Sequence, residues 1–323
     1  MAAMPKPGSD PEPGKGVDQG LTPGRSCPTS YRYSPRVFDR PPEIVAETLY
    51  VVGGLYGNVE AFEEIAGMAA REIGRVAIVF NGDFHWFDVA GADFAQIEAG
   101  VRAHYAMRGN VETEIAAEDS GAGCGCAYPA DVSDALVSRS NEILERLRET
   151  ARGRPGARER LGALPMHLVA RVGEARIGIV HGDAASLAGW GFDRDRLADP
   201  AHRRWIEAMF VEARVHAFAS THTCAAALAR FDGGVVANNG AAGMPNLPGS
   251  RAGLLTRIGL SPLAGEMPLG AAEAAGACVQ IVPIEYDHER WSKRFLASWP
   301  EGSPAHASYF HRIAGGSARA PSA

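Results

Sequence analysis

Residues 49–65, LYVVGGLYGNVEAFEEI, are the stretch that decides the fold. An apolar run ends in a glycine pair, which indicates a buried strand followed by a sharp turn. Asn58 is a favourable N-cap, and Val59, Phe62 and Ile65 follow it at helical spacing. The stretch therefore predicts a strand, a turn and a helix. Such a turn can hold a phosphate or a metal, yet this one carries no carboxylate and no histidine.

The same order of elements continues along the chain. RVAIVF (75–80) predicts a second strand that ends at NGDFHWFD, DFAQIEAG (93–100) predicts a helix, and RAHYAM (102–107) predicts a third strand that ends at RGNVETE. Sites in α/β folds usually lie at the carboxyl ends of such strands. We therefore look for chemistry in the turns that follow the strands.

The second half of the chain is richer in predicted strands. A helix over about 132–150, a hairpin over 166–183 and a helix over 199–215 come first. Four apolar runs follow and read as strands: VHAFAS, AALARFDGGVVANNG, GLLTRIGL and CVQIVPIEYD. Segments resembling amphipathic helices, WSKRF and SYFHRI, close the domain. We expect one α/β (α+β) domain with two packed sheets and outer helices.

Both ends of the 323-residue chain differ from this pattern. The N-terminus is rich in Pro, Gly and Ser and has no apolar stretch typical of a signal peptide. We therefore expect a disordered tail over 1–45, a folded domain over 46–314 and a second disordered tail over 315–323. Nothing in the sequence indicates export, so a cytoplasmic location is expected.

Charge and cysteine content narrow the class of protein. A net charge of −6 argues against a general nucleic-acid-binding surface but is compatible with a phosphorylated substrate, because a metal can supply positive charge locally. No apolar run is long enough to span a membrane. The five cysteines are odd in number, which favours reduced thiols over a disulfide framework.

Turns after four of the predicted strands carry metal-ligating side chains. They hold one carboxylate, one amide and two imidazoles, which belong to Asp83, Asn110, His181 and His222. This mixed oxygen and nitrogen set suits Mn²⁺, Fe²⁺ or Zn²⁺ better than Ca²⁺ or Mg²⁺. We therefore predict that these residues are metal ligands and take part in catalysis.

The order of these turns resembles that of the calcineurin-like metallophosphoesterases, over roughly 47–287. The blocks that carry the resemblance are GGLYGN (53–58), GD (82–83), GNVE (109–112), HGD (181–183), THTC (221–224) and NNGAAGMPN (238–246). The resemblance implies a four-layer αββα sandwich of two mixed sheets with outer helices. It also implies a phosphatase or phosphodiesterase, a hydrolase that cleaves phosphate esters through a metal-activated hydroxide.

Members of that family usually hold two adjacent metals, and this sequence departs from their pattern at one of the two. Gly54, Tyr56 and Cys224 stand where the family has an Asp and two His ligands of the first metal. Every ligand that the resemblance implies for the second metal is kept, namely Asp83, Asn110, His181 and His222. The changes therefore fall on one half of the expected site.

Three hypotheses follow from this pattern. The protein is a phosphoesterase with a single metal, or an enzyme whose first site is rebuilt with Tyr56 and Cys224 as ligands. The third hypothesis is a catalytically inactive protein of the same fold that binds a partner or scaffolds an assembly. The metal, one ion or two, would be Mn, Fe or Zn in the first two cases, and the substrate a phosphomonoester or phosphodiester.

Further residues near these turns have open roles. His85 is a candidate proton donor, because Val111 replaces the histidine often found in the family's Asn motif. Glu112 is expected to support the turn of Asn110, and Asp183, which follows His181, is expected to orient a metal ligand without binding the metal itself. The Gly-rich loop with Cys124 and Cys126 either carries two incidental thiols or, together with Cys224, binds a soft metal; Asn239 and Gly240 are expected to shape a turn.

Overall fold

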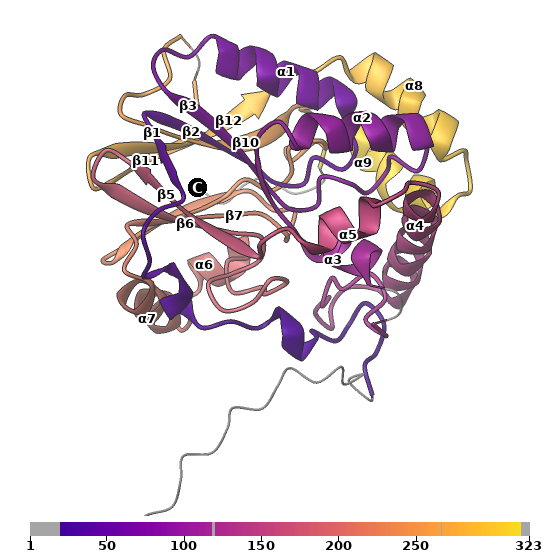
Figure 1. Cartoon of the computed structure of the whole chain (residues 1–323), viewed down its shortest axis with the longest axis horizontal. Helices are drawn as coiled ribbons and strands as arrows, with labels where there is room; N and C mark the ends of the chain where they lie inside the picture. Colours follow the sequence, from indigo (N-terminus) through magenta and orange to yellow (C-terminus); the bar gives the residue numbers. More distant parts are fainter. Residues whose placement is uncertain (1–19, 118–119, 266, 318–323) are drawn as a thin grey trace, which may run out of the picture.

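The computed structural model describes residues 20–117, 120–265 and 267–317 (Figure 1). Two mixed sheets of six strands each are packed face to face, which confirms the predicted α/β sandwich. The first sheet has the order β11-β12-β10-β2-β3-β4, and the second has the order β1-β5-β6-β7-β9-β8. Strands β2, β3 and β4 run parallel, as do β6, β7 and β9, so each sheet has a group of carboxyl ends at one edge.

The strands of the first sheet are β2 (Thr48–Val52), β3 (Val76–Asn81), β4 (Tyr105–Met107), β10 (Gly253–Gly259), β11 (Gly270–Ala274) and β12 (Ala277–Ile284). Those of the second sheet are β1 (Ile44–Ala46), β5 (His167–Val172), β6 (Ala175–Val180), β7 (Ala217–Ser220), β8 (Ala227–Phe231) and β9 (Gly234–Asn238). The predicted hairpin over 166–183 is the antiparallel pair of β5 and β6.

Helices cover the outer faces of both sheets and one end of the sandwich (Figure 1). They are α1 (Val59–Ala70), α2 (Gly91–Val101), α3 (Asn110–Ala116), α4 (Asp134–Arg152), α5 (Ala157–Gly162), α6 (Arg194–Ala198), α7 (Arg203–Ala213), α8 (His288–Ser298) and α9 (His311–Gly315), with a π-helical turn over His306–Phe310. Helices α1, α2 and α8 lie over the first sheet, and α6 and α7 lie over the second.

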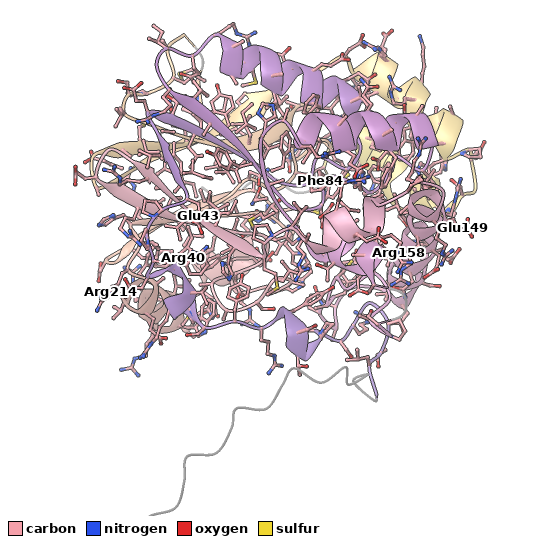
Figure 2. The ribbon with its side chains drawn as sticks, viewed as in Figure 1. Arg40, Glu43, Phe84, Glu149, Arg158 and Arg214 are labelled. Atoms are coloured by element: carbon pink, nitrogen blue, oxygen red, sulfur yellow. The ribbon has the colours of Figure 1, made fainter. Side chains whose placement is uncertain are left out.

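Burial on both faces explains why the strand sequences are almost continuously apolar. Along β2, Leu49 and Val51 point into the core between the sheets, whereas Tyr50 and Val52 pack under the outer helices. Successive side chains of a strand point to opposite faces, so a strand in a central layer needs apolar residues at every position. Side chains fill the space between the layers (Figure 2).

The predicted boundaries of the domain are wrong at both ends of the described chain. Tyr31 and Phe38 are 1% and 0% exposed, and β1 pairs with β5, so the described residues 20–45 belong to the folded domain. Burial of a few aromatic side chains against the rest of the domain stabilises the segment enough to order it despite its polar composition. At the other end, the Ser317 amide donates to the Leu247 carbonyl. Residues 1–19 and 318–323 lie outside the described residues.

Among the described residues, no helix combines the length and apolar character that crossing a bilayer requires.

Candidate metal centre

The four predicted ligands come together where carboxyl ends of the two sheets meet. Asp83 follows β3 and Asn110 follows β4 in the first sheet, while His181 follows β6 and His222 follows β7 in the second. Each sheet thus contributes two side chains. We refer to these residues as the four-ligand cluster.

Two glycines allow the loops of this cluster to approach each other. A Cβ atom on Gly82 would lie 2.5 Å from the Gly109 nitrogen and 2.6 Å from His181 Nδ1. A Cβ atom on Gly109 would lie 2.3 Å from Asp83 Oδ1. The Gly-Asp and Gly-Asn pairs in the sequence therefore reflect close packing of the turns that carry Asp83 and Asn110.

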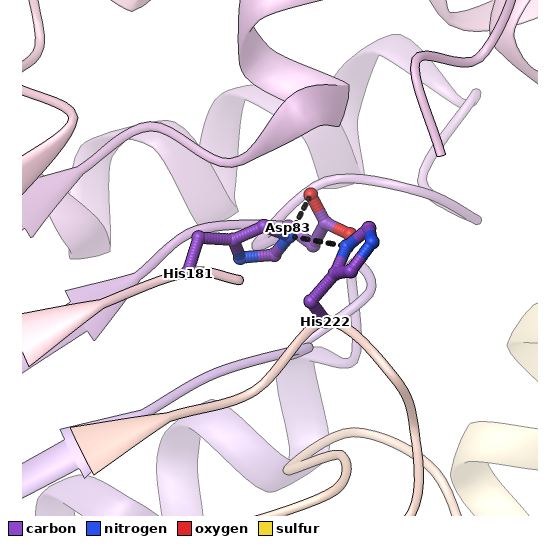
Figure 3. A group of neighbouring side chains, drawn as sticks. All are labelled: Asp83, His181 and His222. Atoms are coloured by element: carbon purple, nitrogen blue, oxygen red, sulfur yellow. Dashed lines mark hydrogen bonds and ion pairs between the residues drawn. The ribbon is translucent and has the colours of Figure 1, made fainter. Parts of the chain in front are cut away.

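The hydrogen bonds of His181 leave one lone pair for the centre of the cluster. Its Nδ1 lies 2.9 Å from the Asn81 carbonyl, so Nδ1 carries the proton and donates. Its Nε2 then faces Asn110 Oδ1 at 3.0 Å and Asp83 Oδ1 at 3.3 Å, both of which only accept. Figure 3 shows His181 pointing at Asp83 and His222.

The other two neutral ligands are oriented in the same way. His222 Nε2 donates to the Cys126 carbonyl at 3.1 Å, which leaves its Nδ1 3.2 Å from His181 Nε2. The Asn110 amide nitrogen donates to the Cys124 carbonyl at 2.9 Å, which turns Oδ1 inward. With neutral imidazoles, acceptor atoms alone meet at the centre.

A cation among these acceptor atoms, either a proton on an imidazole or a metal ion, would remove the repulsion between them. The ligand atoms of Asp83, His181 and His222 all lie within 4.8 Å of one another. One carboxylate, one amide oxygen and two imidazoles match the preferences of Mn²⁺, Fe²⁺ and Zn²⁺. The residues therefore fit a divalent ion.

The two histidines of the cluster titrate in opposite directions. Burial disfavours the charged form of His181, but the Asp83 carboxylate outweighs it and raises the pKa of His181 above its usual value. Burial lowers the pKa of His222 to about 3, and the charge on His181 acts in the same direction. A proton in this cluster therefore belongs to His181.

Backbone strain is concentrated around this centre. Tyr56, Asp83, His222 and Cys224 have φ angles between 53° and 60°, a left-handed conformation that non-glycine residues rarely adopt. Each such residue costs about 1–3 kcal/mol, which the surrounding structure must offset. Strain of this kind is typical of functional sites.

Tyr56 and Cys224 meet beside the cluster. Tyr56 Oη lies 2.8 Å from Cys224 Sγ, which is a hydrogen-bonding distance. A Cβ atom on Gly54 would lie 3.0 Å from Tyr56 Cζ, so the phenol ring occupies the space beside position 54. We refer to these two residues as the Tyr56–Cys224 pair. Its donor atoms converge, but they are satisfied by each other.

Burial keeps the pair protonated. It raises the pKa of Tyr56 well above its usual value, with further contributions from Cys224 and Asp83. It also raises the pKa of the Cys224 thiol. A phenolate or a thiolate, the forms that bind metals, is disfavoured here.

His85 does not occupy the position expected of a proton donor. Its ring is fully buried, stacks on Phe94 at a centroid distance of 3.8 Å and pairs through Nδ1 with Asp88 at 2.6 Å. It does not line the cavity described below. The predicted catalytic role is corrected on this geometry, because a residue enclosed by aromatic packing cannot reach a leaving group.

Other residues named from the sequence support the backbone. Glu112 accepts from the amides of Gly109 and Asp83 at 2.8 Å and thereby ties together two ligand-bearing turns. Asp183 accepts from the amides of Ala185 and Gly191. It therefore holds its own loop.

Three further residues named from the sequence lie in loops near the cluster: Asn239, whose amide joins the two sheets, and the buried Cys124 and Cys126. Asn239 donates to the carbonyls of Gly53 and Leu254. Cys124 and Cys126 are buried, and burial raises the pKa of Cys126 well above that of an ordinary thiol. Neither cysteine belongs to the group of side chains that could hold an ion among the described residues.

A cavity of about 870 Å³ opens onto the cluster. Asp83, Asn110 and His222 line it, whereas His181 is fully buried and does not. Aromatic rings form much of its wall, and charged residues lie around it: Trp86, Tyr128, Trp190 and Tyr309, with Asp131, Asp193, Asp195, Asp199, Arg194, Arg196 and Arg312. The cavity is large enough for a small organic phosphate ester.

Sequence reasoning missed Arg312 and Trp190. The Arg312 guanidinium donates to the carbonyls of Pro245 and Cys224 at 2.5 and 3.1 Å, which fixes it against the Tyr56–Cys224 pair. The Trp190 ring lies 5.5 Å from that of His222. Neither residue belongs to a motif, and only the fold brings them to the cavity.

Known proteins resemble this chain in structure, but none was matched by sequence. No protein-family model matches the chain, and no curated protein matches its sequence. A hypothetical protein from Pyrococcus horikoshii OT3 has a similar structure, with a TM-score of 0.57 and 18% identity over 85% of this chain and 99% of its own. A metallophosphoesterase from Sphaerobacter thermophilus is also similar, with a TM-score of 0.55 and 15% identity over 84% of this chain and 100% of its own.

At these identities the likeness shows the fold. The chain has the metallophosphoesterase fold, as the resemblance of the sequence motifs implied.

Proposed function

We propose that this chain is a metal-dependent phosphoesterase that works with a single ion held by Asp83, Asn110, His181 and His222. The proposal rests on the convergence of their lone pairs. A hydrogen bond on the far side of the side chain orients His181, His222 and Asn110, and the carboxylate of Asp83 offers lone pairs because it is charged. When bound, the ion supplies a Lewis acid that polarises a phosphoryl oxygen and lowers the pKa of coordinated water.

The residues around the cluster suit a small phosphate ester. Arg312 is fixed on the cavity wall and offers a permanent positive charge for a phosphoryl oxygen. The rings of Tyr128 and Trp190 contact each other, with centroids 6.3 Å apart, and together offer an aromatic wall for the organic part of the substrate. Aspartates outnumber arginines among the residues that line the cavity, which disfavours a polyanion such as nucleic acid.

Metal stoichiometry and turnover test this proposal together. After chelation and reloading with Mn²⁺, Fe²⁺ or Zn²⁺, we expect about one ion per chain, because a single set of ligands is free to bind. We also expect hydrolysis of p-nitrophenyl phosphate or its bis-ester. Two ions per chain would contradict the single-site proposal and favour a site rebuilt on the Tyr56–Cys224 pair.

A second candidate function is a catalytically inactive binding protein of the same fold. It is favoured by the Tyr56 ring, which occupies the space beside Gly54. Uptake of one ion without turnover of either ester by any of the three metals would support this candidate over the enzyme.

A further inference from the structure

We infer that the loop around Cys124 and Cys126 positions two of the four metal ligands through its backbone carbonyls, and that Arg25 and Asn141 hold this loop in place. The inference rests on the proposed metal site. It assigns positioning roles to Arg25 and Asn141, which belong to no motif. It also gives the N-terminal segment, residues 20–45, a part in metal binding.

The carbonyl oxygens of the loop contact the ligands directly. Cys124 O accepts from Asn110 Nδ2 at 2.9 Å, and Cys126 O accepts from His222 Nε2 at 3.1 Å. The Trp190 indole also donates to Cys126 O at 3.1 Å. These bonds decide which atom of Asn110 and which nitrogen of His222 faces the centre. Partners of this kind fix the orientation and the tautomer of metal ligands.

The loop needs anchors from outside because its own sequence is permissive. Gly121, Gly123 and Gly125 all have positive φ angles, between 64° and 71°. Glycine loses more conformational freedom on ordering than any other residue. A loop of this composition keeps two carbonyls in fixed positions only if neighbouring elements restrain it.

Asn141, on α4, supplies one anchor. Its side-chain oxygen accepts from the Cys124 amide at 2.9 Å, and its nitrogen donates to the Pro23 carbonyl at 3.4 Å. One side chain thus joins the helix, the loop and the N-terminal segment.

The N-terminal segment supplies the second anchor. The Gly24 amide donates to the Ala122 carbonyl at 2.7 Å, and the Gly24 carbonyl accepts from the Tyr128 amide at 2.8 Å. The Arg25 guanidinium donates to the carbonyls of Pro129 and Val132, both at 2.5 Å. Arg25 therefore fixes the far end of the loop, which also forms a wall of the cavity.

Two matched controls lie on the same elements. Glu142 is the neighbour of Asn141 on α4 and accepts only from Ser138 among the hydrogen bonds described. Arg40 lies on the N-terminal segment and bonds Glu43 and the His167 carbonyl. Figure 2 shows Arg40 and Glu43 on the side of the molecule away from α4.

Cobalt(II) binding to the full-length protein tests the inference, because the visible absorption of this ion reports the arrangement of its ligands. We expect Asn141→Ala and Arg25→Ala to weaken Co²⁺ binding about tenfold and to change its absorption spectrum, as loss of groups that orient ligands does. Glu142→Ala and Arg40→Ala should bind Co²⁺ like the wild type. Melting temperatures without metal identify any variant that fails to fold.

Asn141→Asp keeps an acceptor for the Cys124 amide, so it should restore the wild-type spectrum even if Asn141→Ala is unstable. Wild-type affinity and spectrum in folded Asn141→Ala and Arg25→Ala would overturn the inference, as would equal losses in the two controls. A wild-type protein that takes up no Co²⁺ would overturn the proposed metal site itself, and this inference with it.

Discussion

The four-ligand cluster and the Tyr56–Cys224 pair lie side by side at one cavity, yet the polar atoms of the two groups are satisfied in opposite ways. In the cluster, His181 and His222 each use one nitrogen on a backbone carbonyl and leave the other facing the centre. In the pair, the phenol and the thiol bond each other. By residue type alone, both groups could bind a metal. The difference teaches that a candidate metal site is recognised by lone pairs that no hydrogen bond within the protein uses.

Of the changes considered, removal of the His181 side chain should have the largest effect on metal binding and hydrolysis. His181 contacts every other member of the cluster, so we expect His181→Ala to lose metal and to reduce hydrolysis of p-nitrophenyl phosphate at least about 100-fold. Elemental analysis and steady-state rates measure both quantities. Wild-type metal content in this variant would show that the cluster does not hold the ion.

Gly109→Ala tests whether the close approach of the two turns is needed. Its Cβ would lie 2.3 Å from Asp83 Oδ1, so the carboxylate or the turn must move. We expect metal affinity to fall by about 10–100-fold, with a loss of about 1–3 kcal/mol in the free energy of unfolding.

Gly67→Ala is the matched control for this change. A Cβ there meets only Arg71 Nη1 at 3.5 Å, and the residue lies in α1. The control should keep metal affinity and gain up to about 1 kcal/mol in stability, since alanine favours a helix. A similar loss of metal in both variants would refute the packing argument.

Arg312→Ala distinguishes substrate binding from metal binding, because Arg312 lines the cavity but is not a member of the four-ligand cluster. We expect kcat/KM to fall about tenfold, because one charge-assisted hydrogen bond to the phosphoryl group is lost. Metal affinity should stay unchanged. Arg196→Ala, at an exposed position on the same cavity, is the control and should have a smaller effect on kcat/KM.

The pH dependence of metal binding distinguishes the cluster from the pair. Asp83 raises the pKa of His181, so at a pH below that pKa an ion must displace a proton from it, whereas His222, with a pKa of about 3, is already neutral. Affinity should therefore fall about tenfold per pH unit as the pH drops below the pKa of His181. At a pH below the pKa of His181, calorimetry in buffers of different ionisation enthalpy should find one proton released per ion bound. Two or more would indicate that the phenol or the thiol also binds.

Tyr56→Phe should have the smallest effect. It removes the partner of Cys224 Sγ but no ligand of the cluster, so metal affinity should stay within about threefold of wild type. A loss as large as that expected for His181→Ala would show that Tyr56 is a ligand and that the first metal site has been rebuilt. Isothermal titration measures the affinity of both variants.

Sequence reasoning located the four residues of the cluster because their signals are local. Each follows an apolar strand and stands next to a glycine or a small residue, and the structure brings all four together where the two sheets meet. His85 had the same kind of signal, since it follows Asp83 closely. Its role depended on the direction of its ring, and stacking on Phe94 is a contact that no spacing encodes.

The sequence by itself determined the order of strands and helices, the two sheets and the residues at the strand ends, because periodic burial and glycine turns act over a few neighbouring residues. The tertiary structure alone decided which nitrogen of His222 faces the centre and that Tyr56 and Cys224 satisfy each other. It also brought Arg312 to the cavity wall and Arg25, from the opposite end of the chain, to the carbonyls of Pro129 and Val132 on that wall. These outcomes depend on contacts between distant segments, which arise only when the sheets pack together.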